Sequence, residues 1–164
     1  DELVEQIAAI GENLKIRRNV RFSLQGSGAI GAYIHMGGKV GVLVELGCEK
    51  DDTVAAPAYQ QLLRDLTLHV AACNPSYMVA EEVPAADLAA ERAIFAKQVE
   101  GKPEQIIGKI VDGKVQKFFA ETCLINQGFV KEPKQSITQL LEVKGKELGD
   151  TLEIKRFARY QLGA

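Results

Sequence analysis

Two histidines and three cysteines are the side chains of this sequence that are best suited to acid–base, nucleophilic or metal chemistry. His35 precedes the glycine turn Met36-Gly37-Gly38, and a histidine on such a turn could act as a general base. Catalysis requires a positioned partner, and no GxSxG, HExxH or GxxxxGK[ST] pattern frames this residue. We therefore interpret His35 as an exposed loop residue and rank a hydrolase last among the alternatives.

The remaining groups favour structural roles. His69 falls on the apolar stripe of a helix predicted over 57–73, which is typical of a hydrogen-bonded core histidine. Cys48, Cys73 and Cys123 are odd in number and widely spaced, which disfavours a disulfide framework. Because no CxxC or HxxxH spacing is present, we expect free thiols, no metal site and no cofactor.

Two basic runs suggest an alternative function. The first contains Lys15, Arg17, Arg18 and Arg21, and the second contains Lys155, Arg156 and Arg159. If the two segments pair as strands, Arg17, Arg18, Arg21 and Arg159 would form one positive face that could bind nucleic acid. The net charge of −2 at pH 7 disfavours nucleic acid as the main ligand, so this module stays an alternative.

A short segment near residue 130 predicts a protein contact instead. Phe129 and Val130 stand between Gly128 and Pro133, outside any periodic element. Apolar residues displayed on a loop are typical anchors for a protein partner. The residues alone thus indicate an interaction module and do not identify its partner.

These groups are positioned by elements that predict an α+β domain. We expect an antiparallel sheet of about three to four strands with packed helices and a protruding antiparallel helical hairpin. The strands are predicted over 15–24, 29–35, 39–46 and 151–162, and the packed helices over 57–73 and 136–147. Ile16, Val20, Phe22 and Leu24 share one face of the first strand, and Leu152, Ile154, Ala158, Tyr160 and Leu162 share one face of the last.

The hairpin is predicted over 84–120, where Gly101-Lys102-Pro103 separates two apolar-striped helices. Each stripe spans about two to three heptads, short for a stand-alone coiled coil, so the hairpin packs on the body or binds a partner. A purely structural dimer built on this arm is the second alternative.

Composition supports a soluble cytoplasmic protein. The apolar fraction is 46% and the charged fraction 26%, both ordinary for globular domains. No apolar run approaches the roughly 20 residues that span a membrane, and the acidic start is unlike a signal peptide. The sequence begins without Met inside a predicted helix, from which we expect a fragment of a longer protein.

Seven collinear motifs resemble the elongation factor Ts (EF-Ts) family, and together they cover essentially the whole chain. They are Ile10-Gly11-Glu12-Asn13 with Ile16-Arg17-Arg18; Tyr33-Ile34-His35; Val40-Gly41-Val42-Leu43-Val44; His69-Val70-Ala71-Ala72 with Asn74-Pro75; Phe129-Val130-Lys131 with Pro133; Gln139-Leu140-Leu141; and Arg159-Tyr160-Gln161-Leu162-Gly163. The resemblance implies one core domain over 1–164, with 1–13 remaining from a preceding subdomain and 84–120 inserted as an arm.

The resemblance also implies a function. EF-Ts binds EF-Tu and promotes GDP/GTP exchange by stabilising the nucleotide-free state, without an active site of its own. It places Ile10 and Gly11 near the phosphate-binding loop of EF-Tu, and His35 and Val130 at the interface, to which the loop pattern adds Phe129. The arm matches the self-association segment of some members, for which we select Leu88, Phe95, Ile110 and Phe118.

Two features depart from the family pattern. The three-helix module and the Thr-Asp-Phe-Val segment that usually precede this region are absent from the sequence. We therefore hypothesise that the chain keeps part of the EF-Tu-binding surface and loses much of the exchange power. Gly128 stands where many relatives have proline, which predicts a less rigid loop at Phe129.

Overall fold

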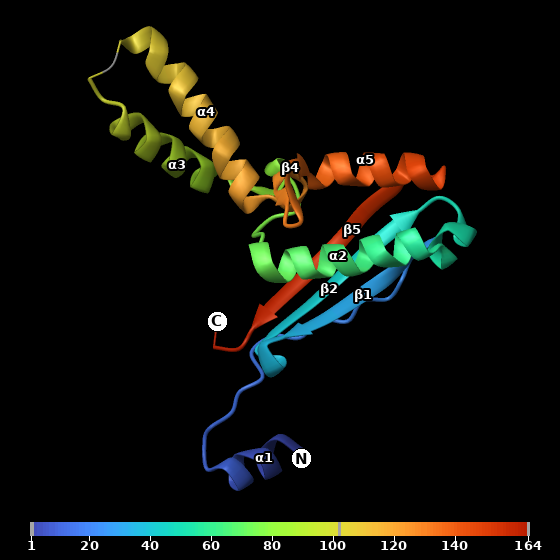
Figure 1. The fold of residues 1–164 in the computed structure, drawn as a ribbon. Helices are drawn as coiled ribbons and strands as arrows, with labels where there is room; N and C mark the ends of the chain where they lie inside the picture. The colour runs from blue at the N-terminus through green and yellow to red at the C-terminus, as the bar shows by residue number, and fades with distance from the viewer. Residues whose placement is uncertain (1, 102, 164) are drawn as a thin grey trace.

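The computed structural model describes residues 2–101 and 103–163 and confirms the α+β class. Two helices cover one face of a three-stranded antiparallel sheet, and two others form a protruding arm (Figure 1). A second sheet is a small two-stranded hairpin. The elements are α1 (Glu2–Ile10), β1 (Gly28–His35), β2 (Val40–Cys48), α2 (Pro57–Cys73), α3 (Ala85–Gln98), α4 (Glu104–Thr122), β3 (Gly128–Phe129), β4 (Glu132–Ser136), α5 (Ile137–Leu148) and β5 (Leu152–Gln161).

The core lies between the main sheet, whose order is β1-β2-β5, and the helices α2 and α5. Period-two alternation in β2 sends four apolar side chains to this face, and all four are buried. Each such side chain contributes about 1.5–3 kcal/mol by leaving water. The buried set on the sheet and helices includes Val40, Val42, Val44, Leu46, Leu62, Leu66, Val70, Ile137, Leu140 and Leu141.

Local signals set the ends of the covering helices. Helix α2 starts with Pro57 in its first turn and ends at Asn74, whose φ of 46° is the left-handed conformation that stops a helix. Helix α5 begins with a capping box in which the Ser136 hydroxyl accepts from the Gln139 amide at 3.2 Å, and the Gln139 side chain accepts from the Ser136 amide at 2.9 Å. The predicted helices over 57–73 and 136–147 are therefore confirmed within one or two residues.

The predicted strand over 15–24 is wrong. Residues 11–25 have no helix or strand, and they cross the outer face of the sheet, opposite the helices. Arg18 stacks 5.0 Å from the centroid of the Tyr160 ring, and Arg156 stacks 4.2 Å from that of Phe22. This segment is held by side-chain contacts over the outer face of the sheet and not by backbone hydrogen bonds to an edge strand. The main sheet therefore has three strands in the described part of the chain.

The predicted single apolar face of the last strand is also wrong. The register of β5 slips by one residue opposite Glu45, which leaves Lys155 as an extra residue in a bulge. The alternation is inverted beyond it. Phe157 faces the core with Leu152 and Ile154, whereas Ala158 and Tyr160 lie on the outer face.

The arm has a core of its own. Val99, Val111 and Val115 are buried between α3 and α4, and Arg92 Nη2 lies 2.5 Å from Asp112 Oδ1 across the two helices. No helix within 2–101 and 103–163, including the 19-residue α4, combines the length and apolarity needed to cross a membrane.

Candidate functional site

The residues predicted to bind a partner lie at three separate places. Ile10 and Gly11 end α1, His35 ends β1, and Val130 lies at the β3–β4 hairpin. Figure 1 places α1 well apart from the hairpin, which lies beside the base of the arm. The structure therefore distributes these residues over an extended surface and does not gather them into one pocket.

His35 is exposed where a tight turn, Met36–Gly38, joins β1 to β2. Its Nδ1 lies 2.9 Å from the Tyr33 hydroxyl, and the two ring centroids are 5.6 Å apart. Met36 has a φ of 51° and is 62% exposed beside it. The turn presents a hydrogen-bonding ring and an apolar side chain to solvent, which suits a protein contact.

The β3–β4 hairpin displays Val130 and buries Phe129. Val130 and Lys131 form its turn, and the Val130 side chain is 42% exposed. Phe129 is only 6% exposed and belongs to the main core, so the expectation that it is displayed beside Val130 is wrong. Consecutive residues of an extended segment point to opposite sides, which explains why one faces the core and the next faces solvent.

His69 holds this turn from α2. The backbone N–H of Val130 donates to His69 Nδ1 at 3.2 Å, so the proton of the neutral ring is on Nε2, which donates to Gln127 Oε1 at 3.0 Å. The ring is fully buried, and burial lowers the pKa of His69 below its ordinary 6.5. The interpretation of His69 as a hydrogen-bonded core histidine is confirmed.

Gln127 is a buried residue of this hydrogen-bond network that the sequence pattern missed. It is 4% exposed, and its side-chain amide donates to the carbonyls of Glu121 at 2.8 Å and Cys73 at 3.4 Å. These carbonyls lie in the last turns of α4 and α2, where helices leave acceptors without internal partners. The residue types around Gln127 do not predict these hydrogen bonds, because the bonds form only where the ends of two helices lie close together in the folded chain.

Ile10 and Gly11 lie outside the core. Helix α1 has no buried residue, and Ile10 is 55% exposed. Gly11, at a φ of 75°, closes the helix with a bond from its N–H to the Ile7 carbonyl at 2.9 Å. The predicted helix end is thus present, with an apolar side chain available to a partner.

The predicted basic face is not formed. Arg159 lies on the helix side of β5, where its Nε donates to the Ala71 carbonyl at 3.3 Å. Arg18 lies on the opposite side of the sheet, over Tyr160. One strand face therefore does not hold all four arginines of the predicted nucleic-acid surface, which are Arg17, Arg18, Arg21 and Arg159. The expectation of a nucleic-acid surface on one such face is wrong.

Three of the four residues selected for self-association also pack within the arm. Leu88, Phe95 and Ile110 are partly buried against the valine core between α3 and α4. The ring of Phe118 lies 5.9 Å from that of Phe119. Outward-facing apolar side chains are found instead at Ile94 and Ile106, each 48% exposed.

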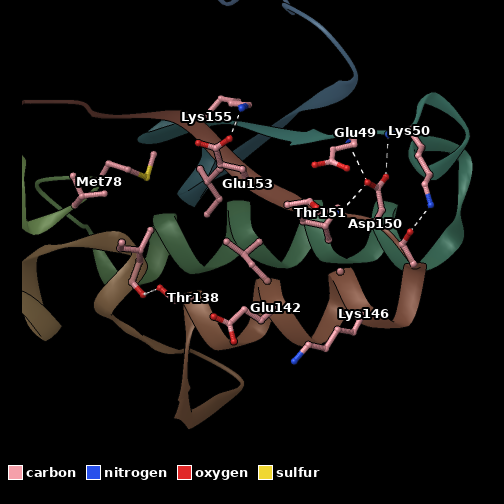
Figure 2. A pocket seen from close by; sticks show the side chains of 17 residues that line it. Glu49, Lys50, Met78, Thr138, Glu142, Lys146, Asp150, Thr151, Glu153 and Lys155 are labelled. Carbon is pink, nitrogen blue, oxygen red and sulfur yellow. Dashed lines mark hydrogen bonds and ion pairs between the residues drawn. The ribbon is translucent and has the colours of Figure 1, made fainter.

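A groove of about 790 Å³ runs between α5 and β5 (Figure 2). Asp150 at its end accepts the Thr53 hydroxyl at 2.5 Å and the Glu49 N–H at 3.1 Å, and these bonds lower the pKa of its carboxyl. Glu153 pairs with Lys155. These carboxylates serve structural bonds, and the described residues contain no group of three or more His, Cys, Asp or Glu placed to hold a metal.

The cysteines are free thiols, as predicted. Burial raises the pKa of the Cys48, Cys73 and Cys123 thiols above the ordinary value of 9.0. A thiol with a raised pKa carries little thiolate at neutral pH and is a weak nucleophile. This chemistry gives the cysteines no catalytic advantage.

The chain is similar to known proteins described as elongation factor Ts. A family model described as Elongation factor TS matches residues 1–164. Elongation factor Ts of Trichlorobacter lovleyi is 45% identical over 163 residues, covering 98% of this chain and 52% of that protein. The Nitratiruptor sp. relative of the same name is 42% identical over 160 residues, with coverages of 96% and 52%. That of Geobacter sulfurreducens is 46% identical over 138 residues, with coverages of 83% and 64%. The chain spans about half the length of the curated relatives it matches.

Proposed function

The chain belongs to the elongation factor Ts family, and on that premise we propose that it acts in translation elongation by binding EF-Tu and promoting GDP/GTP exchange. The observation that carries the proposal is the family match over all 164 residues. It agrees with the seven motifs that the sequence shares with the family. The displayed Val130 and the His35 turn support a protein contact.

The mechanism we propose is thermodynamic linkage. If the chain binds nucleotide-free EF-Tu more tightly than GDP-bound EF-Tu, it must weaken the affinity of EF-Tu for GDP by the same factor. Its side chains then make or break no covalent bond. Their task is to present a fixed surface that fits one state of the partner better than the other.

The proposed EF-Tu surface contains Ile10, Gly11, His35 and Val130. Phe129 acts from within, because its buried ring packs under the hairpin turn. Since α1 lies well apart from the hairpin, EF-Tu would contact the chain over an extended surface (Figure 1). Apolar anchors such as Val130 dominate the affinity of such interfaces when the partner fully desolvates them.

We also propose that 84–120 is an arm inserted into one core domain over 1–164, and that 1–13 continues a preceding subdomain. Helices α2 and α5 pack together although the arm separates them in sequence, and the arm has its own buried cluster. Self-association through the partly buried Leu88, Phe95, Ile110 and Phe118 stays part of the proposal, and the exposed Ile94 and Ile106 of the arm would add to that contact. Sedimentation over a concentration series tests this: dimers should appear as concentration rises, and a monomer throughout would exclude self-association.

The proposed contact is tested with a matched pair of valines. Val130 is 42% exposed on the hairpin, and Val143 is 43% exposed on α5, an element that contains none of the proposed contact residues. We expect Val130→Asp to weaken EF-Tu binding at least about tenfold, because it places a charge in an apolar contact, and Val143→Asp to stay within about twofold. Isothermal titration of EF-Tu measures both, and equal effects would contradict the assigned surface. Failure of the unmodified chain to bind at tens of micromolar would contradict the function.

A further inference from the structure

We propose that His69 and Gln127 are positioning residues of the partner-binding surface, which fix the Val130 turn and the base of the arm to the end of α2. The proposal rests on the proposed function in one respect, since Val130 serves as an anchor only if the chain binds EF-Tu. The positioning itself is a property of the chain alone and can be measured without the partner.

Three consecutive hairpin residues are each attached to α2 by a different contact. The Phe129 ring lies with its centroid 6.1 Å from that of His69, and the Val130 N–H donates to His69 Nδ1. Lys131 Nζ forms a 2.7 Å ion pair with Asp65, whose side chain is 14% exposed. Asp65 and His69 are four residues apart, so they share a face of α2. The backbone of the turn is held on both sides of Val130, and its side chain is left facing solvent.

Gln127 gives the histidine the tautomer that the turn requires. Both of its amide protons are directed to helix-end carbonyls, those of Glu121 and Cys73, so its Oε1 faces the His69 ring. This oxygen accepts the Nε2 proton, which leaves Nδ1 as the acceptor for Val130. Gln127 therefore acts on the turn through His69.

The same side chain ties the arm to the body. Glu121 lies in the last turn of α4, at the base of the arm, and Cys73 is the last residue of α2. The main-chain carbonyl of Gln127 also accepts a hydrogen bond at 3.0 Å from the N–H of Ile137, the first residue of α5. One buried residue thus links three helices to the displayed turn. A surface held in its binding conformation loses less entropy when a partner binds.

The test separates the two nitrogens of the ring. His69→Asn keeps an acceptor near the position of Nδ1 and loses the donor at Nε2, whereas His69→Gln keeps a group near Nε2 and loses the Nδ1 acceptor. Hydrogen exchange at the Val130 amide is measured by NMR on the unmodified chain and both variants. We expect His69→Gln to accelerate exchange about tenfold and His69→Asn to leave it within about threefold. In the unmodified chain, the ring ¹⁵N shifts should show Nε2 protonated.

Affinity for EF-Tu then follows the same order. His69→Gln should weaken EF-Tu binding about tenfold relative to the unmodified chain. His69→Asn should keep most of the original affinity, although both variants remove the imidazole. Equal exchange rates at Val130 in the unmodified chain and in His69→Gln would overturn the positioning role, whatever EF-Tu does. If the unmodified chain does not bind EF-Tu, the proposed function fails, while the exchange rates still decide the inference. Accelerated exchange in His69→Gln without weaker EF-Tu binding would overturn the link between the turn and the partner.

Discussion

Replacing Gln127 with methionine tests the buried hydrogen-bond network at its centre. Methionine has nearly the same length and is apolar, so Gln127→Met creates little cavity and removes the polar contacts. The Glu121 carbonyl and the His69 Nε2–H lose their partners in a region where Gln127 is 4% exposed. The weaker bond to Cys73, at 3.4 Å, contributes less.

The magnitude follows from leaving those two groups without partners. A buried donor or acceptor that loses its partner costs about 1–3 kcal/mol, so we expect the two losses in Gln127→Met to lower the free energy of unfolding by about 2–6 kcal/mol. In a domain of this size, that corresponds to a fall in Tm of roughly 4–24 °C. Urea denaturation followed by circular dichroism gives the free energy, and calorimetry gives Tm.

Gln60 is the matched control. It is an exposed glutamine whose side-chain amide donates to a backbone carbonyl, that of Val54, at 2.7 Å. Water replaces this bond, so Gln60→Met should change stability by less than about 0.5 kcal/mol. Equal and small effects of the two substitutions would show that the Gln127 bonds contribute no more to stability than a solvent-exposed hydrogen bond.

Three further outcomes follow from the packing and the charges. A Cβ at Gly31 would lie 2.9 Å from α2 side-chain atoms, whereas one at Gly41 meets a single atom at 3.6 Å; Gly31→Ala should therefore cost about 1–3 kcal/mol in urea denaturation, with Gly41→Ala near neutral, and the reverse order would contradict the packing. Burial holds the pKa of His69 below 6.5 in the folded chain. As the pH falls, His69 is therefore protonated more readily in the unfolded chain than in the folded one. Stability should fall as pH drops from 7 to 5, and less steeply in His69→Asn; parallel curves would disprove this. Arg156→Met leaves the carboxylate of Glu45, 3% exposed, without its 2.6 Å partner and should cost about 2–3 kcal/mol, more than Glu45→Gln; a smaller loss than in Glu45→Gln would contradict a buried charge.

Elements with strong local signals could be predicted from the sequence. Helix α2 begins and ends where Pro57 and Asn74-Pro75 place its boundaries. Helix α3 ends before Gly101 and α4 begins after Pro103, as these two residues predict, while Lys102 of the predicted turn lies outside the described residues. These signals act through backbone conformation within a few residues, so they do not depend on the rest of the fold. The alternation in β2 is equally local, because every second residue faces the core.

The errors arise where the outcome depends on distant parts of the chain. The alternation of apolar and polar residues over 15–24 indicates that one side of this segment is buried. A strand has this pattern, and so does an extended segment that crosses the face of a sheet, so the pattern does not distinguish the two. The bulge at Lys155 inverts the faces of β5 without any local mark. The sequence pattern predicts Phe129 as an exposed loop anchor, because the hairpin and His69 that bury its ring are not apparent from neighbouring residues. Gln127 acquires its role only where α2 and α4 end side by side.

The affinity of the chain for EF-Tu in its two nucleotide states decides whether the chain promotes exchange by thermodynamic linkage. Nucleotide-free EF-Tu and GDP-bound EF-Tu are titrated with the chain under the same conditions, and release of a fluorescent GDP analogue is followed in parallel. We expect tighter binding to the nucleotide-free form and a GDP affinity that falls by the same factor when the chain is present. Equal affinities for the two forms, or no binding to either, would contradict this expectation.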